Sequence, residues 1–203
     1  MEYDRQSWQR AVDFHGHACP GLAQGFRVSQ AARRILGLEG RAEDEELIAI
    51  VENDACGVDA VQALTGCTLG KGNLIFRNYG KSVFTFARRD RDQAVRIYFH
   101  GGQQPPDREY LQLRRRVEEG SASAEEEAHY RELHRLRIEK LLTQPEEELL
   151  SWQMVRLELP VKARLFNSLP CSRCGEKVSE GRARVRDGKP VCIPCAGSYS
   201  RGW

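Results

Sequence analysis

The chain has 203 residues, of which 40% are hydrophobic and 30% charged, and its formal net charge is +2. This composition is that of a soluble globular protein and is compatible with an enzyme or a binding protein, and the length predicts one large domain with an appendage. No apolar run approaches the roughly 20 residues of a membrane span, and residues 1–10 are polar, unlike a signal peptide, so we expect a cytoplasmic protein without a membrane segment.

The first motif in the chain is Asp13-Phe-His-Gly-His-Ala-Cys-Pro-Gly21, which follows a short helix expected at 7–14. If the backbone of this motif is extended, His15, His17 and Cys19 lie at alternate positions and point the same way. Imidazole nitrogen and thiolate sulfur are ligands of borderline-soft metal ions. The spacing therefore predicts metal binding or catalysis rather than a turn with incidental histidines.

A helix is predicted from Pro20 to residue 36, with Cys19 as its N-terminal cap and Gly37 as its end. The positive end of the helix dipole would lower the pKa of Cys19 below the usual value of about 8.5. Cys19 would then be a thiolate able to bind metal or attack an electrophile. Gly21 and Gly25, four residues apart, would let another backbone or a substrate come close.

Residues 47–51 form a continuous apolar run, which predicts a strand covered on both sides, and 58–65 predict a short helix closed by Gly66. Cys56 falls at the junction between the two, and Asp59 falls in the first turn of the helix.

We therefore expect one site built from two segments distant in the sequence, with His15, His17, Cys19 and Cys56 in a cleft. Asp59 would orient an imidazole or act as a base. The alternative for Cys56 is a buried structural thiol.

Residues 66–73 are rich in glycine, but they do not form a phosphate-binding P-loop. The spacing from Gly66 to Gly70 is one residue too short, and Gly72 stands where Ser or Thr would hold magnesium. We expect a loop beside the site that presents Lys71 or Asn73 to a substrate or cofactor, whereas Cys67 packs in the interior.

The remaining pattern of the larger domain predicts further strands and a helical extension. Strands are expected at 74–76, 82–87 and 94–99, arranged as an antiparallel meander, and at 153–159. The charge-rich region 104–150 predicts two helices with a break at 120–124, with His134 packed between elements, and a third short helix from Pro145. Together these elements predict an α+β fold in which a mixed or antiparallel sheet packs with helices.

Seven cysteines are an odd number, and four of them form two Cys-x-x-Cys pairs near the C-terminus: Cys171, Cys174, Cys192 and Cys195. This spacing predicts a tetrahedral zinc ion in a reducing compartment rather than a disulfide framework, a redox dithiol or an iron–sulfur cluster. A hairpin is expected at 177–186 and back from Lys189, with its turn at Asp187-Gly188. So small a unit has little core of its own, and zinc would supply about 10 to 16 kcal/mol of stability.

The predicted domains are an α+β core with its helical extension at 1–165 and a four-cysteine zinc finger at 166–203. The order of the motifs resembles that of the FmdE family, which takes its name from formylmethanofuran dehydrogenase. The resemblance is carried by Phe14-His-Gly-His-Ala-Cys-Pro-Gly-Leu22, Asp54-Ala-Cys-Gly-Val-Asp-Ala60, Leu64-Thr-Gly-Cys-Thr-Leu-Gly-Lys-Gly-Asn73 and the two C-terminal cysteine pairs. The charged helices at 104–145 lie outside it.

The resemblance implies an α+β core with a metal-binding His/Cys cleft, a treble-clef-like zinc finger and a homodimer. His15, His17, Cys19 and Cys56 match the cleft positions. We expect zinc in the finger and a second metal ion, for which zinc is a candidate, in the cleft. The cleft ion would be bound by His17, Cys19 and Cys56, with His15 as a further ligand or beside the ligands.

These observations predict a metal-binding accessory protein or enzyme of redox or one-carbon metabolism related to formylmethanofuran dehydrogenase. A molybdenum or tungsten oxidoreductase is the expected partner. The alternative is a binding module whose finger contacts nucleic acid or a protein through Arg182, Arg184, Arg186 and Lys189. The near-neutral charge of the larger domain disfavours nucleic acid.

Overall fold

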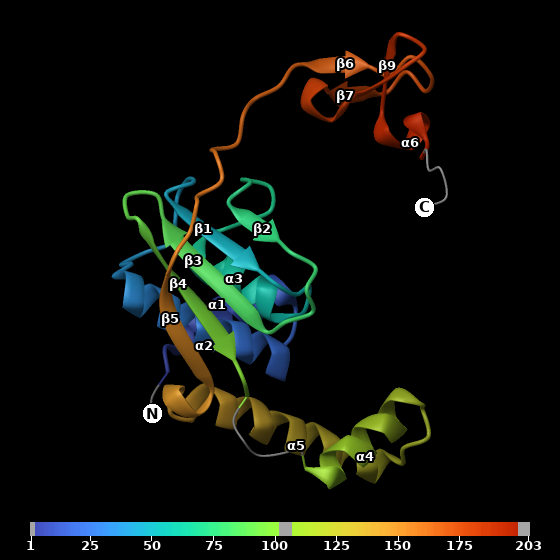
Figure 1. Cartoon of the computed structure of the whole chain (residues 1–203). Coiled ribbons are helices and arrows are strands. Elements are labelled where there is room, and N and C mark those ends of the chain that lie inside the picture. The colour runs from blue at the N-terminus through green and yellow to red at the C-terminus, as the bar shows by residue number, and fades with distance from the viewer. Residues whose placement is uncertain (1–2, 102–106, 199–203) are drawn as a thin grey trace. The chain divides into compact units, whose positions relative to one another are not determined.

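The computed structural model describes residues 3–101 and 107–198. The start of the helical extension expected from residue 104 therefore lies outside the described residues. The chain divides into two compact units, Met1–Lys162 and Ala163–Trp203 (Figure 1). Among the described helices, none combines the length and apolar character that a membrane span requires.

The larger unit contains helices, one 3₁₀ turn and a five-stranded sheet. The helical elements are α1 (Arg5–His15), α2 (Pro20–Leu36), α3 (Gly57–Thr65), α4 (Arg108–Glu118), α5 (Ala124–Thr143) and the 3₁₀ turn Glu146–Glu148. The strands are β1 (Leu47–Val51), β2 (Leu74–Phe76), β3 (Val83–Arg88), β4 (Gln93–Phe99) and β5 (Leu150–Arg156). This mixture confirms the predicted α+β class.

The strands lie in the order β2-β1-β3-β4-β5. The pairs β1–β3, β3–β4 and β4–β5 are antiparallel, whereas β2 runs parallel to β1, with Ala49 opposite Leu74. The prediction of an antiparallel meander was wrong for β2, because the connection through α3 returns the chain to the same end of the sheet. The strand expected at 153–159 starts earlier, at Leu150, so the helix expected from Pro145 is limited to a 3₁₀ turn.

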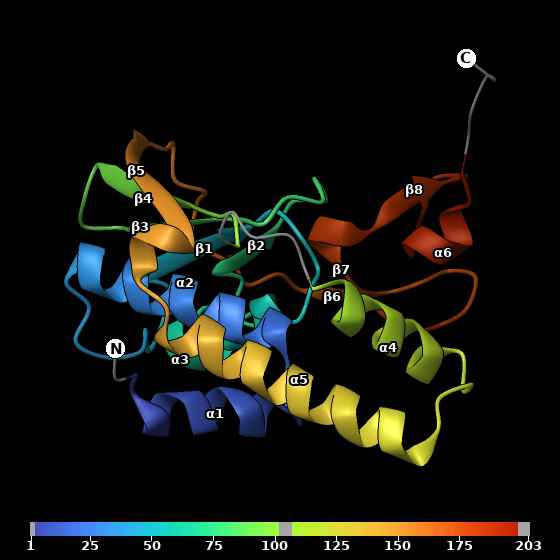
Figure 2. The same cartoon turned by 90° about the horizontal axis from the view of Figure 1, so that it is seen from below.

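Helices α1, α2 and α3 cover one face of this sheet (Figures 1 and 2). Strand β1 is buried along its whole length, as its apolar run predicts. Phe26 of α2 is fully buried, and the rings of Tyr3 and Trp8 meet it edge-on. The apolar core therefore joins the N-terminal segment, α2 and the sheet, and it fixes the helices that carry the imidazole and thiol groups of the first motif.

Two glycines let α2 and α3 approach more closely than side chains would allow. A Cβ atom on Gly25 would lie 2.0 Å from the carbonyl oxygen of Gly57, and one on Gly21 would lie 3.1 Å from Cβ of Cys56. The close approach predicted for these glycines is confirmed. It brings the start of α3, and with it Cys56, against the start of α2.

The helical extension is a hairpin of α4 and α5 that is fastened to α2 by a buried arginine. The Arg27 guanidinium donates to the carbonyl oxygens of Leu141, Leu142 and Gln144 at 3.1, 2.8 and 2.9 Å. Carbonyls at the C-terminal end of a helix have no partner within the helix. Burial lowers the pKa of Arg27. The hairpin is therefore anchored to the core at one end of α5.

The described part of the smaller unit contains two short antiparallel sheets, a 3₁₀ turn and a short α-helix. Its elements are β6 (Ser168–Pro170), β7 (Lys177–Ser179), the 3₁₀ turn Glu180–Arg182, β8 (Arg184–Arg186), β9 (Lys189–Val191) and α6 (Ile193–Ala196). The turn at Asp187 and Gly188 is confirmed, and both residues have positive φ. The single long hairpin expected here was wrong, because β7 pairs with β6 instead of continuing into β8.

Replacing Gly25 with Ala is expected to destabilise the larger unit by about 3 kcal/mol, since the new methyl group meets backbone atoms of Gly57 that cannot move aside. Urea unfolding followed by tryptophan fluorescence measures the loss. The matched control is Gly40→Ala, where nothing lies within 4 Å of the added carbon. Equal stability of the two variants would contradict the close packing of α2 on α3.

Candidate metal centres

The His-rich turn is the end of one helix and the start of the next, not an extended segment. His15 is the last residue of α1, and Gly16 follows in the left-handed conformation with φ of 93°. Cys19 caps α2, which runs from Pro20 to Leu36 as predicted. The expected alternation of side chains is therefore wrong, because α1 continues through His15. Even so, Sγ of Cys19 lies 3.8 Å from Nε2 of His15.

Cys19 is 8% exposed, and its sulfur accepts a hydrogen bond from the backbone N–H of Leu22 at 3.3 Å. Burial raises the pKa of Cys19, and the neighbouring Cys56 thiol raises it further, which together outweigh the lowering by the Leu22 N–H. The lowered pKa predicted from the helix dipole is thus wrong in the metal-free protein. Desolvation of the thiolate is the larger effect.

Cys56, which directly precedes α3, completes a cluster with His15 and Cys19. One ligand atom from each of the three residues lies within 4.8 Å of the other two. Cys19 is buried, whereas His15 and Cys56 are partly buried. The three residues come from the end of α1, the cap of α2 and the start of α3, so the site depends on all three helices.

Asp59, in the first turn of α3, contacts the ring nitrogen of His15 that does not face Cys19. Its Oδ2 lies 2.7 Å from Nδ1 of His15, whose side chain is only 11% exposed. A carboxylate at Nδ1 fixes the ring orientation and leaves Nε2 facing Cys19, which is the usual arrangement behind a metal-binding histidine. The orienting role predicted for Asp59 agrees with this geometry.

His17 occupies a different position from the one the sequence suggests. Its side chain is exposed, and its ring lies 4.6 Å from the His15 ring, centroid to centroid. Among the described residues, the cluster of potential ligands contains His15 and not His17. The structure thus brings His15, and not His17, together with the two thiols, whereas the sequence predicted His17 as the ligand.

The donor set of this cluster fits a zinc-type ion. One nitrogen and two sulfurs converge from three elements, and bonds of about 2.0–2.3 Å could connect them to a single ion. Three protein ligands leave a fourth position for a substrate or water, as in catalytic zinc sites, whereas structural sites are closed by four ligands. The structure therefore supports a candidate metal site in the larger unit.

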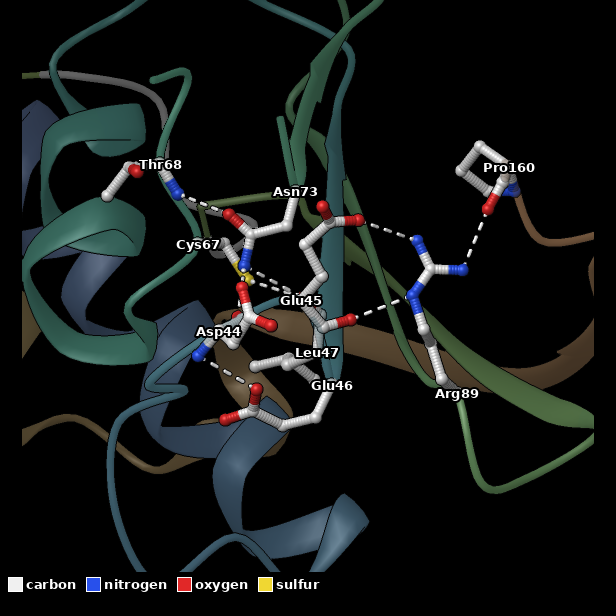
Figure 3. A network of polar contacts seen from close by, with 9 residues as sticks. All are labelled: Asp44, Glu45, Glu46, Leu47, Cys67, Thr68, Asn73, Arg89 and Pro160. Atoms are coloured by element: carbon white, nitrogen blue, oxygen red, sulfur yellow. Dashed lines mark hydrogen bonds and ion pairs between the residues drawn. The ribbon is translucent and has the colours of Figure 1, made fainter. Parts of the chain in front are cut away.

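The side chains of Lys71 and Asn73 donate hydrogen bonds to backbone carbonyls of the segment 42–47 and do not belong to this cluster. Nζ of Lys71 donates to the carbonyls of Ala42 and Glu43 at 3.0 and 3.1 Å. Asn73 is fully buried, and Figure 3 shows its amide between Thr68 and the segment 44–47. The cofactor-binding role predicted for both residues conflicts with these contacts, because their polar groups bind backbone atoms.

Cys67 is a packed thiol, as predicted. Its side chain is fully buried, and its Sγ lies 3.5 Å from the carbonyl oxygen of Leu47. Burial raises its pKa to about 11. This cysteine therefore provides a natural comparison for Cys19 and Cys56.

The second cluster lies in the smaller unit, where the sulfurs of Cys171, Cys174, Cys192 and Cys195 lie within 4.8 Å of one another. Backbone N–H groups of Cys174, Cys192 and Arg173 lower the pKa of Cys171 to about 6, while the neighbouring thiols raise that of Cys195 to about 12. The cluster thus favours ionisation of one thiol but disfavours ionisation of all four. A divalent cation removes this opposition and is bound by all four sulfurs.

Replacing Cys171 with Ser is expected to release one zinc ion per chain and to unfold the smaller unit, since the ion is its main source of stability. Hydrogen exchange should rise throughout 168–196 and stay unchanged in β1, which belongs to the other unit. Unchanged exchange in 168–196 after zinc loss would contradict a structural role for the ion.

Comparison with known proteins gives a match for each unit. Residues 14–151 match the family described as FmdE, molybdenum formylmethanofuran dehydrogenase operon, and residues 164–201 match the prokaryotic dksA/traR C4-type zinc finger. A probable S-adenosyl-L-methionine-binding protein from Archaeoglobus fulgidus is 37% identical over 196 residues, which cover 94% of this chain and 52% of that protein. The chain thus spans about half the length of this curated relative.

A crystal structure of an FmdE-like protein from Syntrophus aciditrophicus, titled after a tungsten formylmethanofuran dehydrogenase, has the same fold. It matches with a TM-score of 0.61 at 23% identity over 97% of both chains. The family match, by contrast, rests on sequence and spans more than half of this chain. The resemblance found in the motifs is therefore confirmed: the protein is a metal-binding member of the FmdE family that carries a dksA/traR-type C4 zinc finger.

Proposed function

We propose that the larger unit binds a second metal ion through His15, Cys19 and Cys56, and that this ion serves a reaction of redox or one-carbon metabolism. The observation that carries the proposal is the convergence of one imidazole and two thiols within 4.8 Å, with Asp59 held 2.7 Å from the outer nitrogen of the imidazole. Structural zinc sites seldom leave a ligand position open, so this set favours a site that acts on a bound molecule.

Each residue of such a site would have its own role. His15, Cys19 and Cys56 would hold the ion, which supplies Lewis-acid activation of a bound oxygen or carbonyl group. Asp59 keeps the proton of His15 on Nδ1, so that Nε2 stays available as a ligand. The imidazole of His17 is exposed and lies next to that of His15.

The names of the relatives support the metabolic setting. The family is described by a molybdenum formylmethanofuran dehydrogenase operon, and the structural relative is titled after the tungsten enzyme. This protein would accordingly act beside a molybdenum or tungsten oxidoreductase, either as an enzyme or as an accessory. The Archaeoglobus relative is described as a probable S-adenosyl-L-methionine-binding protein, so this molecule belongs among the ligands to be tested.

Metal analysis of cysteine variants tests the proposal. The wild type, reconstituted with zinc, should contain two ions per chain, and Cys19→Ala or Cys56→Ala should contain one, because each removes a ligand of the cleft ion. Cys67→Ala is the matched control, since it also removes a buried thiol, but one outside the cluster.

His17→Ala should keep two ions, because His17 is not in the ligand cluster. A wild-type protein with one ion per chain that Cys19→Ala retains would refute a metal site in the larger unit. Loss of an ion in Cys67→Ala as well would show that the variants act by general destabilisation.

We also propose that the protein is a homodimer. The support is the charged helical hairpin, which carries half-exposed Leu111 and Leu136, together with the expectation drawn from the FmdE family. Light scattering at micromolar concentration should give the mass of two chains. A monomer mass over that range would refute the dimer.

The alternative function is binding of nucleic acid or a protein by the finger. Arg182, Arg184 and Lys189 are exposed, which favours it, whereas Arg186 donates to the carbonyl oxygen of Ala196 at 2.6 Å and so supports the fold of the finger. Binding to phosphates would weaken steeply with added salt.

A further inference from the structure

The hairpin of α4 and α5 contains a hydrogen-bonded pair, a buried tyrosine and a partly buried histidine, that the proposed metal site does not use. Tyr110 is 6% exposed, and its hydroxyl lies 2.9 Å from Nδ1 of His134. The Tyr130 ring stacks on Tyr110 at 5.4 Å, and the Arg137 guanidinium lies 5.1 Å from the centre of the same ring. His134 is therefore held firmly, with Nε2 as the ring nitrogen that Tyr110 does not occupy.

Helix α5, which carries His134, packs along α2, whose N-terminal cap is Cys19. Arg27 of α2 binds the carbonyls of Leu141 and Leu142 of α5, and the two helices run side by side in the same direction (Figures 1 and 2). Each helix advances about 1.5 Å per residue. About two turns from these contacts toward the N-terminus of each helix, this rise would bring His134 level with the start of α2, where Cys19 is the cap.

The charges around His134 give independent support for this placement. Its pKa is lowered by burial and then by Arg114, Arg137 and His17. His17 thus acts on His134 from the turn that also carries His15 and Cys19. Two of these groups, Arg114 and Arg137, are guanidinium cations, and Arg114 is paired with Glu118. An anion bound beside His134 would be attracted by Arg137.

We propose that the α4–α5 hairpin is the outer wall of the site formed by His15, Cys19 and Cys56, and that His134, anchored by Tyr110, is a positioning residue for a small anionic ligand. This inference rests on the proposed function, since the ligand would bind beside the ion. Nε2 of His134 supplies a hydrogen bond to the ligand, and Arg137 supplies positive charge. Asp59 and His134 then support the site from opposite sides, one through His15 and the other through the ligand.

Paramagnetic NMR of the cobalt(II)-loaded protein tests the placement. In protein with labelled histidines, cobalt in the cleft should shift or broaden the His134 ring signals strongly. His129 is the matched control, because it lies on the same helix but is exposed and bound to Glu109. Cys56→Ala, which keeps cobalt only in the finger, should abolish the effect on His134. Equal effects on His134 and His129 in the wild type would overturn the inference.

Azide binding to the cobalt protein, followed by visible absorption, tests the role. His134→Ala should weaken azide binding about tenfold, the effect of losing one hydrogen bond to a charged group, while cobalt affinity stays the same. Tyr110→Phe should weaken it less, since it only loosens the ring, and His129→Ala should leave it unchanged. An unchanged azide affinity in His134→Ala would overturn the positioning role.

A third measurement needs no metal in the cleft and separates this inference from the proposed function. Failure of the cleft to bind cobalt would refute the proposed function. In the metal-free protein, His17→Ala should still shift the ring signals of His134 in the NMR spectrum, because it removes a neighbouring ring. The ring signals of His129 should stay in place. Unmoved His134 signals would overturn the placement of the hairpin beside the site.

Discussion

The contact between Gly25 and Gly57 is the constraint on which the larger unit depends. A Cβ atom on Gly25 would lie 2.0 Å from the Gly57 carbonyl oxygen, so the two backbones touch. This contact brings Cys56 to the start of α2, where Cys19 is the cap, and the first turn of α3 then places Asp59 behind His15. Without it Cys56 and Asp59 would not meet His15 and Cys19.

Both cysteine clusters place thiols where ionising all of them is unfavourable without a cation. In the larger unit burial is the first cause, and it raises the pKa of Cys19. In the finger the thiols themselves are the first cause, and they raise the pKa of Cys195. The clusters differ in what surrounds them. The finger has four sulfurs and little core, so its metal stabilises the fold, whereas the larger unit has an extensive apolar core of its own and can support an open site.

Local signals in the sequence predicted the helix caps, the buried strand β1, the four cysteines of the finger and the residue types of the cluster in the larger unit. Pro20 after Cys19 is one such signal, and Cys-x-x-Cys is another. The sequence did not show which of His15 and His17 lies with the two thiols. These residues are compatible with a helix end and with an extended turn, and only the left-handed conformation of Gly16 in the structure distinguishes the two. The anchoring of α5 to α2 by Arg27 was also missed. The partners of Arg27 lie 114 to 117 residues away, and no local pattern identifies such contacts.

Anomalous diffraction at the zinc absorption edge, from crystals of the zinc-reconstituted protein, tests the central claim most directly. The account predicts two peaks per chain. One lies among the four finger sulfurs, and the other lies about 2.3 Å from the sulfurs of Cys19 and Cys56 and about 2.0–2.1 Å from Nε2 of His15. A single peak in the finger, with Cys19 and Cys56 free in fully reconstituted protein, would contradict it.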